Sequence, residues 1–138
     1  MNRYDFQRLS DIRIREAGVL LDAGCYAGSY YLAGYAVECA LKACVAQTTR
    51  RYEFPNKALA NQVHTRKLEV LLTAAGLAES MERMASVNKP LFANWERTLA
   101  WNETARYSLH IKAPEARKLY DACGMTENGV LPWLKIMW

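Results

Sequence analysis

The chain has 138 residues, the size of one ordinary domain, and 51% of them are apolar while 23% are charged. These values exclude a disordered chain, a collagen-like chain and a metal-stapled mini-protein, so we expect residues 1–138 to form a single domain with its own core. Eighteen Lys and Arg stand against 14 Asp and Glu, and the resulting net charge of +4 permits phosphate binding without requiring it.

The first residues and the most apolar stretch argue against secretion and membrane insertion. Residues 1–6 enter a mixed charged and apolar pattern directly, with no apolar run that ends in a cleavage site. The stretch Tyr30–Ala46 contains Glu38 and Lys42 and is short for a membrane span, so it fits a buried helix better. We therefore expect a cytoplasmic protein with no membrane contact.

The cysteines and the short motifs indicate no metal and no cofactor. The four cysteines form no C-x-x-C pair and have no histidine at ligand spacing, so we expect reduced thiols in the core. They are Cys25, Cys39, Cys44 and Cys123. The phosphate-binding, dinucleotide-binding, serine-hydrolase and zinc-protease motifs are all missing from the sequence.

Helical periodicity dominates the first third of the chain, and no segment alternates as a strand does. A helix is expected over Phe6–Ala23, with apolar residues on one face and charged residues on the other, and Gly24 ends it. The next helix, Tyr26–Gln47, is apolar nearly all round, so it is expected to be the central element. Residues Thr48–Val63 break the periodicity and form the longest candidate loop.

Further helical segments follow that loop. They are expected over Thr65–Ala75, over Leu77–Val87, from Pro90 through Leu99, over Pro114–Cys123, and from Val130 or Leu131 to the C-terminus. The chain carries no internal repeat and no linker between domains. We predict an all-α domain, a compact bundle of five or six helices with an up-and-down core and a long loop after the second helix.

Two histidines leave few candidates for acid–base chemistry. His64 precedes the third expected helix and fits a structural role near the helix start. His110 follows Arg106 by four positions, so a helix there would place an imidazole and a guanidinium on one face. That pair suits phosphodiester cleavage, because the imidazole moves a proton and the guanidinium stabilises charge on the phosphate oxygens. The alternative is a solvated Arg106 and a loop His110 before Pro114.

A polar stripe crosses the otherwise apolar second helix. Tyr31, Tyr35, Glu38 and Lys42 are spaced by 4, 3 and 4 positions, and Glu38 precedes Lys42 in the order that favours an ion pair. In an apolar helix such a pair needs water, a partner group or a pocket. It is either a structural pair at the rim of the bundle or the polar floor of a cleft shared with Arg106.

Two smaller features concern packing. Arg13 and Glu16 lie within the apolar arc of the first helix, where we favour a structural i,i+3 pair. The C-terminal segment is apolar and contains Trp133, Ile136, Met137 and Trp138. It either packs back on the bundle or forms a patch for assembly.

Four segments of the chain resemble the HEPN domain family, in the order in which that family has them. They are Arg15–Tyr26 with Tyr35–Ala43 for the first two helices, His64–Leu72 for the third, Trp101–Tyr107 for a later Trp-to-Arg-Tyr segment, and Trp133–Lys135 for the closing helix. The block A-V-E-x-A-L-K-A at residues 36–43 is fairly specific. The resemblance covers nearly the whole chain.

Resemblance to the HEPN family implies a helical bundle that commonly dimerises. Many members are metal-independent endoribonucleases, often toxins or defence effectors encoded beside a small nucleotidyltransferase, with an Arg followed by a His after four to six residues. The Arg carries over to Arg106 and the His to His110, with three residues between them and Tyr107 in place of the usual polar neighbour. Arg106-Tyr107 is closer to members of the Arg-Tyr type, which lack an evident catalytic histidine.

Two functions follow from the residues and the resemblance together. One is a non-catalytic module that binds a nucleotide or RNA or holds a minimal nucleotidyltransferase, and the resemblance implies that it is a homodimer. Its ligand-binding residues would be Tyr31, Tyr35, Glu38, Lys42 and Tyr107, with added charge from Arg50, Arg51, Lys57 and Arg106. The other is a metal-independent endoribonuclease in which two protomers bring Arg106 and His110 into one composite site.

Overall fold

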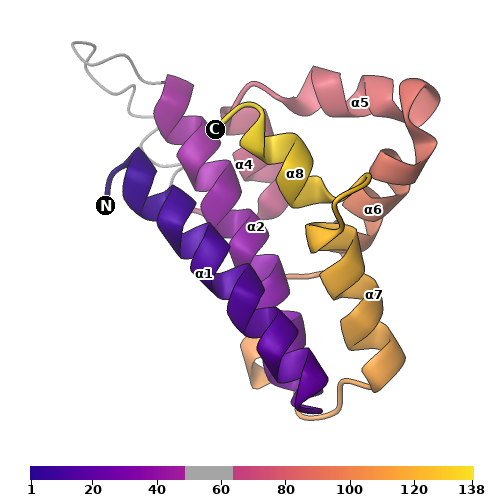
Figure 1. Cartoon of the computed structure of the whole chain (residues 1–138). Coiled ribbons are helices and arrows are strands. Elements are labelled where there is room, and N and C mark those ends of the chain that lie inside the picture. The colour runs from indigo at the N-terminus through magenta and orange to yellow at the C-terminus, as the bar shows by residue number, and fades with distance from the viewer. Residues whose placement is uncertain (49–63) are drawn as a thin grey trace.

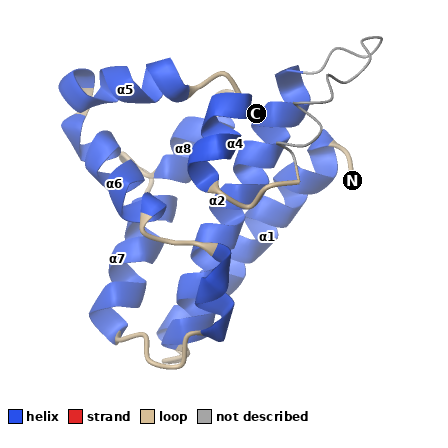
Figure 2. Ribbon diagram, turned by 180° about the vertical axis from the view of Figure 1, so that it is seen from behind, coloured by secondary structure: helices blue, strands red, loops and turns tan. Residues whose placement is uncertain are grey.

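The computed structural model describes residues 1–48 and 64–138, and these segments contain seven α-helices, one 3₁₀-helix and no strand (Figures 1 and 2). The helices are α1 (Arg3–Asp22), α2 (Tyr26–Thr48), α4 (Leu68–Ala74), α5 (Ala78–Val87), α6 (Lys89–Leu99), the 3₁₀-helix η1 (Glu103–Tyr107), α7 (Ala113–Gly124) and α8 (Val130–Lys135). The prediction of an all-α bundle is confirmed, but the described residues contain seven α-helices where five or six were predicted. The expected loop falls almost wholly on residues 49–63, outside the described residues.

α1 begins and ends at residues that the sequence marks. The Asn2 side chain accepts a hydrogen bond from the Asp5 N–H, and the Asp5 carboxylate accepts one from the Asn2 N–H, so two donors at the helix start are satisfied. At the other end Gly24 adopts a φ of 78°, which glycine reaches without strain. The chain therefore turns sharply, and α1 and α2 lie side by side in opposite directions (Figure 1).

α2 is the central element, as its apolar composition predicts. It packs against α1, α4, η1, α7 and α8, and its buried residues point to every side. Two serines tie it to α1: the Ser10 hydroxyl donates to the Ala36 carbonyl and the Ser29 hydroxyl donates to the Ala17 carbonyl, each at 2.8 Å. These buried hydroxyls are satisfied and hold the two helices in one register.

Gly34 allows a tryptophan to lie directly on the backbone of α2. A Cβ built at Gly34 would lie 2.2 Å from a ring carbon of Trp101, which stands two residues before η1. Any side chain at position 34 would therefore displace this indole, which is 3% exposed. The small residues of α2 thus permit the close approach expected of them, and they bring the chain around Trp101 against the centre of the bundle.

The helix expected from Thr65 begins three residues later, at Leu68. Lys67 is the N-cap residue and has an extended backbone. Its N–H donates to the Thr65 hydroxyl and takes no part in the hydrogen bonds of the helix. His64 is exposed in the preceding turn and does not cap α4. The short α4 is followed by α5, which lies across the end of the bundle rather than along α2 (Figures 1 and 2).

The C-terminal segment packs back on the bundle. Leu134 is fully buried, and Trp133, Met137 and Trp138 pack against the core. The Gln7 side-chain amide of α1 donates to the Trp138 carbonyl at 2.9 Å, and the Lys135 ammonium lies 2.6 Å from the Asp11 carboxylate. Ile136 alone among the large apolar residues of this segment is strongly exposed, at 80%. The structure therefore favours packing over an assembly patch.

The cysteines are placed largely as expected. Cys39, Cys44 and Cys123 are buried free thiols, whereas Cys25 is an exposed free thiol in the turn between α1 and α2. The expectation of a core position is thus wrong for Cys25, because the turn at Gly24 carries it outside the packed face. Among the described helices, none has the length and apolar character needed to cross a bilayer.

Candidate functional site

A buried carboxylate lies at the middle of α2 and is held by two cations. Glu38 is 1% exposed, which is rare for a glutamate. One of its oxygens lies 3.0 Å from the Lys42 ammonium, one turn further along α2. Arg66, just before α4, donates through its Nε to both carboxylate oxygens, at 3.1 and 3.0 Å. A single buried negative charge thus meets two positive charges that come from different parts of the chain.

Two tyrosines of α2 complete this group. Tyr31 and Tyr35 stack with ring centroids 6.0 Å apart and planes inclined by 5°. The Arg66 Nη2 donates to the Tyr31 hydroxyl at 3.1 Å, and the guanidinium lies 5.5 Å from the centre of the Tyr35 ring, within cation–π range. We call Tyr31, Tyr35, Glu38, Lys42 and Arg66 the Glu38 cluster.

α1 contributes a further cation to the edge of the cluster. The Arg13 guanidinium lies 5.9 Å from the Tyr35 ring centre and 2.9 Å from the Glu16 carboxylate. The predicted i,i+3 pair between Arg13 and Glu16 is therefore confirmed. Because both partners are partly exposed, this pair itself adds little stability. Its effect is to hold a guanidinium near Tyr35.

The pKa values of Arg66, within the cluster, and of Cys39, beside it, are both raised. Burial by itself lowers the pKa of the Arg66 guanidinium, but its bond to Tyr31 and the negative charge of Glu38 outweigh burial, so the pKa is raised. Burial, together with the negative charge of Glu38, raises the pKa of the Cys39 thiol to about 11. Arg66 therefore stays charged and Cys39 stays a neutral thiol near neutral pH, which excludes Cys39 as a ready nucleophile.

Trp101 connects the cluster to the segment that follows α6. Its ring stacks on Tyr31, with centroids 6.0 Å apart and planes inclined by 27°. The Trp101 Nε1 is buried and has no hydrogen-bond partner among the described residues. A buried N–H without a partner costs free energy, so the packing of this indole on Gly34 and Tyr31 has to outweigh that cost.

The pair Arg106 and His110 does not share a helix face. The segment forms a 3₁₀-helix that ends at Tyr107, and Ser108 is already extended, so the four-residue spacing loses the meaning it has in an α-helix. Arg106, Tyr107 and His110 are exposed, and the Arg106 guanidinium lies 4.9 Å from the centre of the Tyr107 ring. The catalytic prediction required Arg106 and His110 to share one helix face, and within one chain they do not. His110 is instead a loop residue, as in the alternative prediction.

The structure joins four of the predicted site residues and separates the others. Tyr31, Tyr35, Glu38 and Lys42 lie together, as their spacing on α2 predicts. Within residues 1–48 and 64–138, the cation that joins them is Arg66 rather than Arg106, which makes no ion pair or hydrogen bond with them. Of the two alternatives for the polar stripe, the structure supports a structural ion pair and not a cleft shared with Arg106.

Arg66 is the site residue that sequence reasoning missed. It is 28 positions from Glu38, and no helical period relates the two. The available signal was indirect: a glutamate inside an apolar helix needs more compensation than one lysine four positions away. Two basic residues, Arg66 and Lys67, stand just before an apolar helix, but the sequence does not tell which of them turns inward.

The described residues contain no group of three or more His, Cys, Asp or Glu side chains arranged to hold a metal ion. Comparison of the chain with protein-family models, with curated proteins and with solved structures produced no match.

Proposed function

We propose that this chain is a non-catalytic module that binds single-stranded RNA or a nucleotide through the Glu38 cluster. The observation that carries the proposal is the pairing of two partly exposed cations, Lys42 and Arg66, with a single buried carboxylate beside two stacked tyrosines. Cations beside aromatic faces are the usual means by which proteins hold phosphates and unstacked bases.

The charge and donor count of the cluster suit an anionic ligand. Lys42 and Arg66 contribute two positive charges and Glu38 one negative charge, so the group carries a surplus of one positive charge. An ammonium has three donors and a guanidinium has five, and the bonds to Glu38 and Tyr31 use only part of that capacity. The buried carboxylate orients both cations, so a phosphate would meet donors that are already in place.

Other basic residues assigned to the same role are less informative. Arg50, Arg51 and Lys57 lie in residues 49–63, outside the described residues. Arg106 and Tyr107 form a second exposed basic and aromatic pair, with the guanidinium 4.9 Å from the ring centre.

The assembly expected from the HEPN resemblance is part of the proposal. A homodimer and a minimal nucleotidyltransferase partner are inferred from that resemblance. Light scattering on the purified chain tests the dimer, and co-purification with a minimal nucleotidyltransferase tests the partner. A monomer that retains no such partner would remove both.

The direct test measures binding of a short labelled single-stranded RNA, and of ATP, by fluorescence anisotropy and calorimetry at several salt concentrations. Lys42→Gln is expected to weaken binding of every RNA sequence and to reduce the dependence of log K on log salt by about one unit, because one phosphate contact is lost. Lys42→Arg is expected to restore binding, since it keeps the charge.

Lys118→Gln is the matched control, because it removes one exposed lysine from α7, outside the cluster. Equal binding by wild type, Lys42→Gln and Lys118→Gln would refute the proposal, as would an absence of binding by wild type. Cleavage of the RNA by wild type but not by His110→Ala would instead establish the endoribonuclease, with a composite site built from two protomers.

A further inference from the structure

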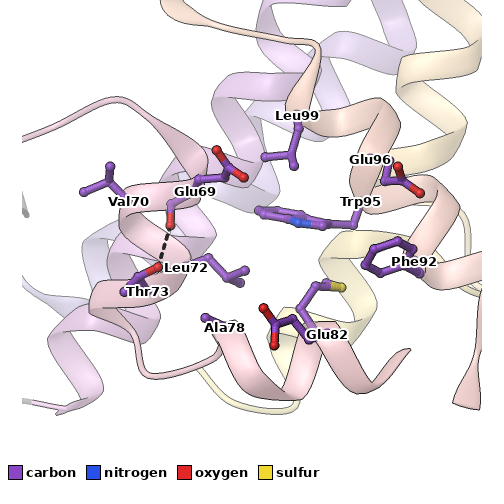
Figure 3. A pocket seen from close by; sticks show the side chains of 11 residues that line it. Glu69, Val70, Leu72, Thr73, Ala78, Glu82, Phe92, Trp95, Glu96 and Leu99 are labelled. Carbon is purple, nitrogen blue, oxygen red and sulfur yellow. Dashed lines mark hydrogen bonds between the residues drawn. The ribbon is translucent and has the colours of Figure 1, made fainter. Parts of the chain in front are cut away.

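A cavity lies between α4, α5 and α6. Its volume is about 630 Å³, within the range of small-molecule pockets (Figure 3). α5 packs on α6 but touches α4 only slightly, so the three short helices leave a space between them. The site shares no lining residue with the Glu38 cluster.

The floor of this cavity is apolar and aromatic. Leu72 of α4, Met81 of α5 and Trp95 of α6 are buried beneath it, and Phe92 and Leu99 of α6 are partly buried at its side. In Figure 3 the Trp95 ring extends from α6 across the space toward α4, with Phe92 next to it. A ligand here would thus rest on an indole and a phenyl ring.

The rim of the cavity carries one sign of charge. Each of the three helices supplies one exposed glutamate: Glu69 from α4, Glu82 from α5 and Glu96 from α6. Figure 3 shows these three carboxylates around the Trp95 ring on different sides. None of the residues that line the cavity is Lys, Arg or His, and within the described residues none of the three glutamates forms an ion pair.

The charge around this cavity is opposite in sign to the net charge of the chain. The protein carries a net charge of +4, yet three carboxylates surround this one aromatic cavity. Arg83 and Arg97 follow Glu82 and Glu96 in sequence but do not line the cavity, because consecutive residues on a helix face different directions. Carboxylates around a low-dielectric recess concentrate their field inside it and attract cations.

We propose that the cavity between α4, α5 and α6 binds a small organic cation, an alkyl or aryl ammonium with an apolar body. The apolar body would displace water from the partly buried Val70, Phe92 and Leu99, which lie beside the buried floor. The ammonium would lie near the ring faces of Trp95 and Phe92, where aromatic quadrupoles attract it, and within reach of the three glutamates. An anionic ligand such as RNA is repelled by the same rim, so this site and the Glu38 cluster take ligands of opposite charge.

The test compares two probes of the same shape, 4-phenylbutylamine, which is a cation at neutral pH, and the neutral 4-phenylbutanol. Titrations followed by ¹H–¹⁵N NMR are expected to move the indole signal of Trp95, assigned with Trp95→Phe. The amine is expected to bind at least about tenfold more tightly than the alcohol at low salt, and the ratio is expected to fall as salt screens the rim.

The triple variant Glu69→Gln, Glu82→Gln, Glu96→Gln is expected to bind both probes equally. The matched control Glu79→Gln, Glu115→Gln, Glu127→Gln changes the net charge by the same amount at exposed glutamates outside the cavity and is expected to keep the preference for the amine. The three single rim variants give the same comparison with less perturbation, so loss of folding in the triple variant does not obscure the result.

Equal affinity of wild type for amine and alcohol would overturn the proposal, because the cavity would then be merely apolar. Absence of binding by either probe, or shifts confined to residues away from α4, α5 and α6, would overturn it as well. Arg66→Gln is expected to leave amine binding unchanged. Failure of RNA binding at the Glu38 cluster is therefore distinguishable from failure of this site.

Discussion

Glu38 and Arg106 are two charged residues that lie in opposite environments, one buried in the bundle and the other at its surface. Glu38 is buried in α2 and meets two cations, one from its own helix and one from the chain before α4. Arg106 is exposed on a short 3₁₀-helix, where its guanidinium lies against the ring of Tyr107. A charge inside the bundle requires specific partners, whereas a charge at the surface is satisfied by water. Residue spacing predicted the contact of Glu38 with Lys42, because both lie on one α-helix, but it predicted neither the contact with Arg66 nor the surroundings of Arg106.

Removal of the Glu38 carboxylate should have the largest effect. Glu38→Ala leaves two cations, Lys42 and Arg66, without their shared counter-charge in a partly buried position, and it also opens a cavity. We expect the free energy of unfolding to fall by about 3–5 kcal/mol, measured by urea denaturation.

The matched control is Glu127→Ala, since Glu127 is exposed beyond the end of α7. Its effect should stay within about 0.5 kcal/mol. A Glu38→Ala protein as stable as the control would show that the cluster contributes nothing to the fold, and the contrast between buried and exposed charge would fail.

A comparison of the two arginines tests the same contrast with a smaller effect. Arg66→Gln removes two hydrogen bonds to a buried carboxylate and one to Tyr31, so we expect a loss of about 1–3 kcal/mol. Arg106→Gln, at an exposed position, should change the free energy of unfolding by less than about 0.5 kcal/mol. The free energy of unfolding is measured by thermal and urea denaturation. If Arg66→Gln and Arg106→Gln lowered it equally, the assignment of Arg66 as the partner of Glu38 would be contradicted.

The free energy of unfolding at alkaline pH tests the burial of the Cys39 thiol, which is next to Glu38 in α2. The pKa of the Cys39 thiol is about 11 in the folded chain against an ordinary 9.0, so above pH 9 the unfolded chain releases a proton that the folded chain retains. The contribution of Cys39 is therefore fully present below pH 9 and is lost as the pH rises toward 11, by about 1 kcal/mol per pH unit.

Cys44 and Cys123, whose pKa burial raises to about 12, add to the same decline. Cys39→Ala should reduce the slope of stability against pH by the share of one thiol. Cys25→Ala is the matched control, because Cys25 is an exposed thiol in the turn between α1 and α2. Identical slopes for both variants and wild type would show that the Cys39 thiol ionises freely in the folded chain.

The parts of the site that sequence reasoning found are those that local geometry connects. Tyr31, Tyr35, Glu38 and Lys42 lie on one helix, and a helix places residues three and four positions apart on one face. The Arg13 and Glu16 pair follows from the same rule. Arg106 and His110 were related by that rule too, but Asn102 caps a 3₁₀-helix that ends after five residues, and the rule does not extend beyond it.

The remaining parts depend on packing between distant segments. The inward turn of Arg66 depends on where the chain re-enters the bundle after α2, and the position of Trp101 depends on Gly34. The acidic cavity needs α4, α5 and α6 to be placed around one tryptophan, although Glu69, Glu82 and Glu96 are separated by 13 and 14 positions and share no sequence pattern.

Most of the helical bundle, the central place of α2 and the end of α1 at Gly24 follow from the chain alone, because apolar periodicity, capping residues and glycines act over a few neighbouring residues. The partner of Glu38, the separation of Arg106 from His110, and the meeting of three glutamates over Trp95 were decided by the tertiary structure. The physical reason is that burial sets the need for a counter-charge, while the docking of distant helices determines which residue lies close enough to supply it.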